Sequence, residues 1–225
     1  MCGAFYICDM EHPIINGLNI PARTIFCIGR NYAKHAAEMN ADIPSTPVVF
    51  LKPLSSICYS GDTVKLPIQS KSVHYEGEIV VAIGKSGNNI NEEDALKHIA
   101  GIGCGIDFTA RDLQKDAKVK GLPWSISKGF KNFAPISNFL PLSGLSLQDL
   151  GIELTLNDEI RQSGKVSDMI FSIPALVSYL STITTLYPGD LIFTGTPEGV
   201  GQVKEDEIVT AAIPTLNCSV SVRIT

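Results

Sequence analysis

The sequence predicts a mainly β fold with short α elements, an α+β class. Residues 73–84 form an apolar, β-branched run that ends at Gly84, which is typical of a strand buried on both faces. The segments 153–161 and 208–224 alternate polar and apolar residues, as half-buried strands do, and the helical patterns are few and short. The sequence therefore predicts a core dominated by strands.

A single domain is expected at residues 21–225, after a short N-terminal segment at 1–20. A folded chain of 24.2 kDa exposes roughly 10,000 Å², against about 35,000 Å² for the extended chain. Its 44% hydrophobic and 18% charged residues are typical of an ordinary soluble globular protein. We therefore expect a core that is stable without disulfides.

Charge and cysteine usage narrow the expected partners. A net charge of −5 without a Lys/Arg cluster argues against a surface for nucleic acid or anionic membrane, so we expect a small-molecule partner. The six cysteines are scattered without a C-x-x-C pair, which predicts reduced thiols. No apolar run reaches the ~18 residues of a spanning helix, and residues 1–10 do not resemble a signal peptide. We expect a cytoplasmic location.

The remaining strands follow from local patterns. Apolar runs predict strands at 25–30, 48–51, 102–106 and 191–194. Pro53 is expected to end the second of these, because proline cannot pair within a sheet. Asn157 and Asp158 are expected to turn a hairpin within 153–161. Pro214 separates two alternating strands in the tail.

The helices also follow in chain order. Helical patterns predict helices at 31–39, 92–100 and 110–120. Gly101 and Gly121 are expected to end the second and third of these helices, and residues 122–130 to form a loop. Pro174 suits the first turn of a further helix. Its expected buried stripe consists of Leu176, Tyr179, Leu180 and Ile183.

Two carboxylates stand at the start of the central apolar run. Because side chains on a strand repeat with period two, Glu76 and Glu78 project from one face, with Cα atoms about 6.6 Å apart. Two such acids repel each other unless one is protonated or a cation lies between them. The alternative is that both point into solvent at the end of a strand. The segment alone leaves both possibilities open.

Other polar residues allow a functional and a structural interpretation. His35 and Glu38 share a helix face, so the carboxylate could orient the imidazole, or the two could form an incidental surface ion pair. Asp107 could be a third ligand, or it could help Thr109 and Asp112 to cap a helix.

Lys128 and the glycine-rich segment 195–201 also allow two interpretations each. Lys128 could serve a site or be solvated. The glycines and threonine of 195–201 could present backbone N–H groups to an anionic ligand or form an ordinary turn.

Four separated segments carry a resemblance to a known family. They are GRNYAKHAAE at 29–38, HYEGE at 74–78, the run 107–112 with LPWSISKGF at 122–130, and GDLIFTGTPEGVG at 189–201. Together they resemble the fumarylacetoacetate hydrolase (FAH) family, most closely its acylpyruvate hydrolase branch. The resemblance implies an FAH-type catalytic domain with a mixed β-sandwich or roll and peripheral helices. It also implies a homodimer that binds one Mg²⁺ or Mn²⁺.

The resemblance also assigns roles to individual residues. The implied metal ligands are Glu76, Glu78 and Asp107. The implied catalytic residues are His35, Glu38, Lys128 and Gln114, with His35 and Glu38 as a water-activating dyad on a lid. The implied substrate-binding residues are Arg30, Lys52, Arg111 and Thr196. Three oxygen anions without Cys or His also suit a hard octahedral cation on chemical grounds.

The implied substrates are 2-oxo acids. The resemblance implies hydrolysis of the C–C bond of acylpyruvate-type 2,4-dioxo acids through a metal-stabilised enolate. The alternative is an oxaloacetate decarboxylase or oxaloacetate keto-enol tautomerase with the same metal site. A third possibility is a non-catalytic member that binds a ligand in the carboxylate cage.

Overall fold

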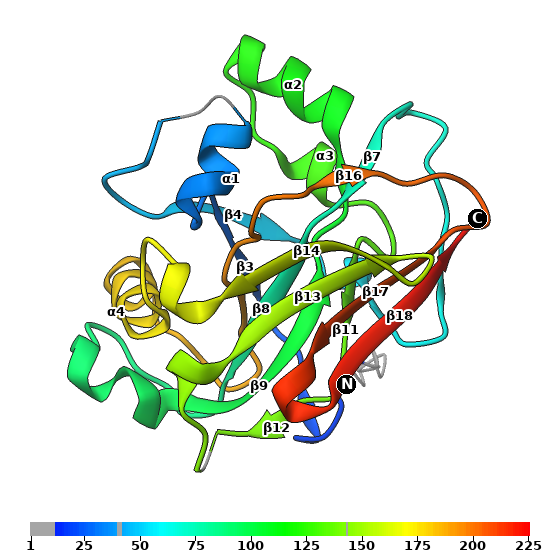
Figure 1. Ribbon diagram of the computed structural model, residues 1–225. Helices are drawn as coiled ribbons and strands as arrows, with labels where there is room; N and C mark the ends of the chain where they lie inside the picture. The colour runs from blue at the N-terminus through cyan, green and yellow to red at the C-terminus, as the bar shows by residue number, and fades with distance from the viewer. Residues whose placement is uncertain (1–11, 40–41, 143) are drawn as a thin grey trace, which may run out of the picture.

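Two β-sheets pack against each other in the computed structural model, which describes residues 12–39, 42–142 and 144–225. The larger sheet contains β3 (Ile25–Gly29), β4 (Val48–Lys52), β5 (Ile57–Tyr59), β8 (Gly77–Ile83), β9 (Ile99–Ile106), β11 (Ala134–Ile136), β12 (Leu140–Pro141) and β15 (Leu191–Phe193). Its strand order is β4-β3-β15-β8-β9-β11-β5, with β12 beside β9. The smaller sheet, in front of β8 and β9 in Figure 1, contains β14 (Glu159–Lys165), β13 (Gly151–Leu156), β17 (Ile208–Ile213), β18 (Cys218–Ile224) and β6 (Thr63–Val64).

Short strands and helices complete the described part of the chain. The further strands are β1 (Ile14–Ile15) paired with β2 (Ile20–Pro21), and β7 (Val73–Tyr75) between β10 (Thr109–Ala110) and β16 (Gly201–Gln202). The α-helices are α1 (Ala33–Glu38), α2 (Arg111–Lys120), α3 (Ser125–Lys128) and α4 (Ile173–Ile183). The 3-10 helices are Leu54–Ser56, Glu92–His98, Leu147–Asp149, Val166–Asp168 and Pro214–Leu216.

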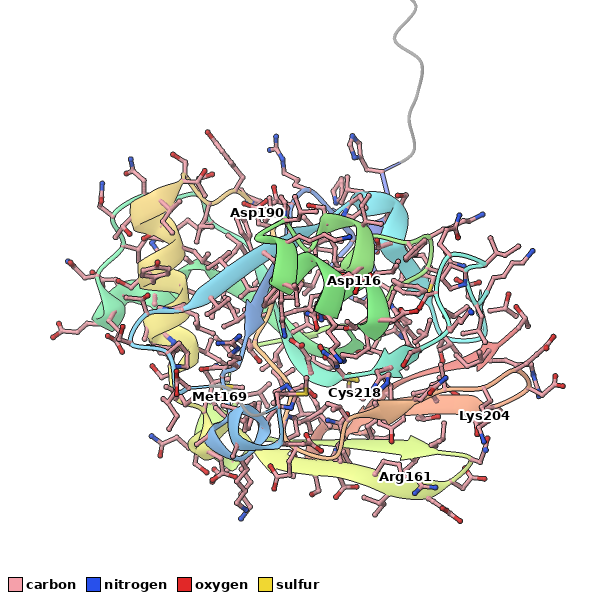
Figure 2. The ribbon with its side chains drawn as sticks, turned by 90° about the horizontal axis from the view of Figure 1, so that it is seen from above. Asp116, Arg161, Met169, Asp190, Lys204 and Cys218 are labelled. Atoms are coloured by element: carbon pink, nitrogen blue, oxygen red, sulfur yellow. The ribbon has the colours of Figure 1, made fainter. Side chains whose placement is uncertain are left out.

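Three of the four described α-helices lie close together. Figure 1 shows α1, α2 and α3 at one end of the molecule, and Figure 2 looks down on that end, with Asp116 of α2 and Arg161 of β14 labelled. No described helix has the length and apolar character needed to cross a membrane.

The central strand β8 is buried on both faces, as its sequence predicts. Ile79, Val81 and Ile83 pack into the cluster shared with the smaller sheet, whereas Val80 and Ala82 pack into a second cluster on the opposite face. This burial holds the strand that carries Glu78 rigidly between two apolar layers.

Several predicted elements are confirmed. Helix α2 ends where expected, and Gly121 follows it in the left-handed conformation, with φ 65°. Asn157 and Asp158 turn the β13–β14 hairpin with φ 51° and 66°. The tail forms the β17–β18 hairpin around Pro214. The mainly β class with short helices is therefore confirmed.

Four local expectations differ from the structure. The run 73–84 is not one strand, because β7 and β8 separate at Glu76 and join different sheets. The helix expected at 92–100 is a 3-10 helix that ends at His98, and Gly101 lies within β9. A Cβ at Gly101 would lie 2.6 Å from the carbonyl oxygen of Leu140, so this glycine permits close pairing with β12 rather than ending a helix.

The other two differences concern helices. The loop expected at 122–130 contains α3. In α4, Ile183 is 62% exposed and Tyr179 is half-buried, so the buried stripe consists instead of Ile173, Leu176, Val177 and Leu180.

The expected N-terminal segment and thiols are only partly described. Of the segment 1–20, residues 1–11 lie outside the described residues, and β1 and the start of β2 lie in the remainder. The four cysteines in the described residues are free and buried. Cys2 and Cys8 lie outside the described residues.

Candidate metal and active site

Three carboxylates from separate parts of the chain converge in the core. Glu76 lies at the junction of β7 and β8, Glu78 lies on β8, and Asp107 follows β9. A ligand oxygen from each lies within 4.8 Å of the others, and the residues are 5%, 1% and 0% exposed. The antiparallel pairing of β8 with β9 aligns these segments, and the Asp107 N–H donates to the Glu76 carbonyl at 2.8 Å.

The donor set fits a hard divalent cation. All three ligands offer carboxylate oxygens, as Mg²⁺ and Mn²⁺ prefer. The Oδ1 atom of Asp107 is buried and accepts no hydrogen bond within the described residues, although it forms an ion pair of 2.7 Å with Lys52. This oxygen therefore has a lone pair left for a metal ion. The two carboxylates predicted to share a face do so, and the solvent-facing alternative is wrong.

Cationic side chains compensate this buried negative charge. The Lys128 ammonium donates to Glu76 at 2.8 Å and to Asp107 at 2.5 Å, and Arg111 donates to Glu76. Burial alone would raise the pKa of Glu76, but the charges of Lys128 and Arg111 outweigh it and hold this pKa well below the usual value. Burial would lower the pKa of Lys128, but Asp107 and Glu76 outweigh it and raise this pKa.

Glu78 has a different environment. Burial, and then the nearby carboxylates of Asp107 and Glu76, raise the pKa of Glu78 well above its usual value. The Gly195 N–H donates to Glu78 at 2.7 Å. A Cβ at Gly195 would lie 2.7 Å from the Cβ of Asn31, and the φ of 97° also favours glycine. The predicted backbone donor of this loop therefore contacts a carboxylate of the protein itself.

Lys52 lies behind the carboxylates. Its ammonium donates to the carbonyl oxygens of Phe108, Lys128 and Phe133 at 3.1, 2.5 and 2.9 Å, and it pairs with Asp107. Its side chain is fully buried and does not line the pocket. Lys52 therefore ties together the segments that carry Asp107 and Lys128.

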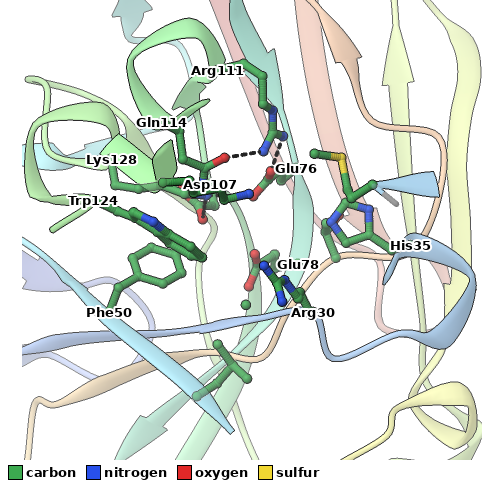
Figure 3. Close-up of a pocket in the computed structure, with 15 residues that line it drawn as sticks. Arg30, His35, Phe50, Glu76, Glu78, Asp107, Arg111, Gln114, Trp124 and Lys128 are labelled. Atoms are coloured by element: carbon green, nitrogen blue, oxygen red, sulfur yellow. Dashed lines mark hydrogen bonds and ion pairs between the residues drawn. The ribbon is translucent and has the colours of Figure 1, made fainter. Parts of the chain in front are cut away.

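His35 faces the three carboxylates across the pocket (Figure 3). His35 is 5% exposed, and its Nδ1 lies 3.2 Å from Oε2 of Glu38. Glu38 in turn accepts from the Gly199 N–H at 3.1 Å. All of the predicted site residues except Glu38 and Lys52 line this one pocket.

Two aromatic residues form a wall that the sequence interpretation did not assign. The Phe50 and Trp124 rings lie 5.5 Å apart, and both line the pocket (Figure 3). The Lys128 ammonium lies 4.8 Å from the Phe50 ring, and Lys118 Nζ lies 5.1 Å from the Trp124 ring. The presence of one tryptophan in the whole chain, within a motif segment, is the signal that could have found this wall.

Gln162 is a second missed residue. It accepts from the Gly77 N–H at 2.9 Å and donates to Thr196 Oγ1 and to the Pro197 carbonyl, both at 2.8 Å. It thereby connects the backbone between the two glutamates to the Thr196 loop. Its position opposite Leu154 in the hairpin places it on the inward face, and a polar residue at an inward position is the signal that could have found it.

Comparisons with known proteins agree with this geometry. Residues 24–221 match the family described as "Fumarylacetoacetate (FAA) hydrolase C-terminal". An oxaloacetate tautomerase from Arabidopsis thaliana is 46% identical over 194 residues, which are 86% of this chain and 87% of the relative. An oxaloacetate decarboxylase from Dictyostelium discoideum is 42% identical over 87% of this chain and 90% of the relative. Both are named as mitochondrial proteins, and the cytoplasmic location expected here stays a prediction.

A solved structure has the same fold. The fumarylpyruvate hydrolase from Pseudomonas aeruginosa, in complex with Mn²⁺ and pyruvate, superimposes with a TM-score of 0.87 and 40% identity, covering 92% of this chain and 91% of the other. The match to the family spans most of the chain, and the carboxylate cluster and the fold agree with it. This chain is therefore a member of the fumarylacetoacetate hydrolase family.

Proposed function

We propose that the chain is a divalent-metal-dependent hydrolase that cleaves the C–C bond of acylpyruvate-type 2,4-dioxo acids. The observation that carries this proposal is one pocket lined both by the three buried carboxylates and by His35, whose ring is held by Glu38. A site that holds a 2-oxo acid and also carries a positioned base suits hydrolysis better than binding alone.

The chain's own residues have separate roles in this proposal. A divalent cation held by Glu76, Glu78 and Asp107 would supply an electrophile for the carboxylate and 2-oxo oxygens of the substrate. An ammonium group has three N–H donors, and Lys128 uses two of them on Glu76 and Asp107. The third is available to the 2-oxo oxygen, where negative charge develops as the C–C bond breaks.

His35, across the pocket from the carboxylates, would activate water in this proposal. Because Glu38 holds Nδ1 of His35, Nε2 is the nitrogen available to take a proton from water. Gln114 accepts from Arg111 through Oε1 at 2.8 Å, which leaves its amide N–H groups for water or substrate. Arg30 and Thr196 line the same pocket and stay proposed substrate-binding residues.

Oxaloacetate tautomerisation or decarboxylation is a second candidate function. The similarity to an oxaloacetate tautomerase and an oxaloacetate decarboxylase favours it. Neither reaction requires attack by water, so both would use the carboxylates and Lys128 without requiring the His35–Glu38 pair as a base for water. The two candidates therefore differ in their dependence on His35.

One assay separates these candidates. Purified protein loaded with Mg²⁺ or Mn²⁺ is given acetylpyruvate and oxaloacetate, and pyruvate, acetate, CO₂ and loss of the enol absorbance are measured together. Equal amounts of pyruvate and acetate from acetylpyruvate are expected for the hydrolase. If acetylpyruvate is stable while oxaloacetate loses CO₂ or tautomerises, the second candidate is correct. Metal-dependent oxalate binding without any turnover would support a binding protein instead.

The homodimer is also a proposal. Leu51, Leu122 and Ile126 are 51%, 55% and 71% exposed, and they lie on β4 and around α3, beside the pocket. Apolar side chains gathered in this way favour a contact with another chain. Sedimentation velocity should give twice the mass of the 24.2 kDa chain, and Leu51→Ser with Ile126→Ser should shift the protein to a monomer.

A further inference from the structure

Gln162, Thr196 and the backbone of Gly77 form a closed set of hydrogen bonds beside the carboxylate cluster. Gln162 Oε1 accepts from the Gly77 N–H at 2.9 Å, and Gln162 Nε2 donates to Thr196 Oγ1 at 2.8 Å. Thr196 Oγ1 in turn donates to the Gly77 carbonyl at 2.9 Å. Gln162 is 1% and Thr196 is 3% exposed, so bulk water does not compete for these bonds.

Two backbone groups fix the orientation of the Gln162 amide. The Gly77 N–H can only donate and the Pro197 carbonyl can only accept, so Oε1 faces Gly77 and Nε2 faces Pro197. Thr196 Oγ1 therefore accepts from the Gln162 amide and does not give its proton to it.

The Gly77 carbonyl needs the proton of the Thr196 hydroxyl. The Asp107 N–H donates to the Glu76 carbonyl between β9 and β8, so the backbone groups of the next residue, Gly77, point to the other side of β8. On that side β15 ends at Phe193 and does not reach Gly77. Since an unpaired buried carbonyl costs free energy, the Thr196 hydroxyl is held in this direction.

The Thr196 hydroxyl can therefore only accept a hydrogen bond from a ligand. A hydroxyl has one proton and two lone pairs, and here the proton goes to Gly77 and one lone pair accepts from Gln162. Thr196 lines the pocket, and the second lone pair is what its hydroxyl can offer there. The carboxylate and 2-oxo oxygens of the proposed substrates also only accept, whereas water has two O–H donors.

We propose that Thr196 Oγ1 accepts one O–H of the water molecule that attacks the substrate, and that Gln162 is the positioning residue that fixes this oxygen. Thr196 then binds water, the second substrate of the hydrolysis, rather than the 2-oxo acid. This inference rests on the proposed function, because it needs a reaction that consumes water.

The second O–H of this water gives its proton to Nε2 of His35, and the water oxygen bonds to the distal carbonyl carbon of the substrate. The C–C bond at that carbon then breaks, and its electron pair forms the enolate of pyruvate. The proton returns from His35 to the methylene carbon, so the products are pyruvate and the acyl acid.

Thr196→Val tests the water contact, because valine keeps the shape of threonine without the hydroxyl. In the Mn²⁺-loaded protein, kcat for acetylpyruvate should fall about 10- to 100-fold, with KM within about twofold. Calorimetry should give an oxalate dissociation constant within about twofold of the unmodified protein, because ionised oxalate has no O–H to donate. Thr196→Ser retains the hydroxyl and should restore most of kcat. Thr210→Val is the control, since Thr210 donates to Ser221 and does not line the pocket.

A double-mutant cycle tests the role of Gln162. Gln162→Met should lower kcat, and this effect should shrink to less than about threefold when Thr196 is already valine. Oxalate binding by each variant shows that its site is folded. An equal effect of Gln162→Met in both backgrounds would overturn the positioning role.

The water contact is overturned if Thr196→Val weakens oxalate binding about tenfold or more, as expected for a hydroxyl that donates to a carboxylate. It is also overturned if Thr196→Val hydrolyses acetylpyruvate at the unmodified rate. An unmodified protein that binds oxalate but does not hydrolyse acetylpyruvate is a different result. It would overturn the proposed function and this proposal with it.

Discussion

The carboxylate cluster and helix α1 form two sides of one pocket, but very different contacts hold them. Behind the cluster, the Lys52 ammonium is fully buried and contacts Asp107 together with three carbonyl oxygens. Lys128 and Arg111 hold Glu76, and the Gly195 N–H holds Glu78. These buried contacts would preorganise the proposed metal ligands.

Helix α1 buries His35 and Ala36, but two of its attachments are contacts that solvent reaches. Glu38 accepts from the exposed Gly199 N–H, and the Lys34–Glu198 ion pair of 3.4 Å has side chains that are 83% and 41% exposed. Exposed ion pairs contribute about 0 to 1 kcal/mol. The comparison teaches that the proposed metal-binding side is held by buried charges, whereas the proposed water-activating side depends in part on exposed contacts.

Glu76→Gln should have the largest effect, because it removes a proposed metal ligand and keeps the side-chain size. Substitution of a residue that supports a metal ligand typically weakens metal binding roughly 10- to 100-fold. We expect Glu76→Gln to weaken Mn²⁺ binding by more than this and to abolish metal-dependent turnover. Calorimetry with Mn²⁺ and the steady-state rate measure both effects. Glu159→Gln, at an exposed glutamate, is the control. If Glu76→Gln binds Mn²⁺ with the affinity of the unmodified protein, the carboxylate cluster is not the metal site.

His35→Ala should lower the rate of hydrolysis without lowering the metal affinity, and so distinguish the roles of the two sides of the pocket. Removing a general base lowers the rate of hydrolysis by about 10²- to 10⁴-fold, while Mn²⁺ affinity should stay within about twofold. Both are measured on one preparation, with His98→Ala, away from the pocket, as the control. Equal losses of metal affinity and rate would place His35 among the metal ligands. An unchanged rate would favour the reactions of oxaloacetate.

Lys52→Met should act mainly on stability. It leaves Asp107 and the carbonyl oxygens without their buried cation, and breaking such a buried pair lowers the free energy of unfolding by about 3 to 5 kcal/mol. Urea unfolding measures this loss in the metal-free protein. Lys97→Met removes an exposed pair with Asp94 and should change little. If Lys52→Met unfolds like the unmodified protein but raises KM, Lys52 contacts substrate instead.

Lys34→Met should have the smallest effect. It removes the exposed pair with Glu198, so we expect kcat/KM to change by less than about fivefold, with no change in Mn²⁺ affinity. The difference from the unmodified protein should shrink in high salt, because salt screens exposed charges. A loss approaching that of His35→Ala would show that α1 depends on this ion pair, and that the contrast between the two sides is wrong.

Much of the fold follows from local sequence because local forces determine it. The burial of β8, the end of α2 at Gly121 and the Asn157–Asp158 turn each depend on a pattern or on a backbone conformation. The error at Gly101 has a tertiary cause, since this glycine makes room for the Leu140 carbonyl. Local patterns do not contain such contacts.

In the candidate site, too, local patterns predict some features, and contacts between distant segments determine the others. The two-residue spacing of Glu76 and Glu78 predicts their shared face, even though the strand breaks at Glu76. The motifs place most of the proposed residues in one pocket. The position of Lys52 behind Asp107, and the contact of Gln162 with the Gly77 N–H, depend on strands far apart in the chain.

Trp124 is the only tryptophan in the chain, and it stands in the pocket wall between Phe50 and Lys118. Its fluorescence emission therefore comes from the ligand pocket alone, with no background from other indoles. Occupancy of the pocket can be followed in unlabelled protein by stopped-flow fluorescence, on a timescale that separates binding from the chemical step.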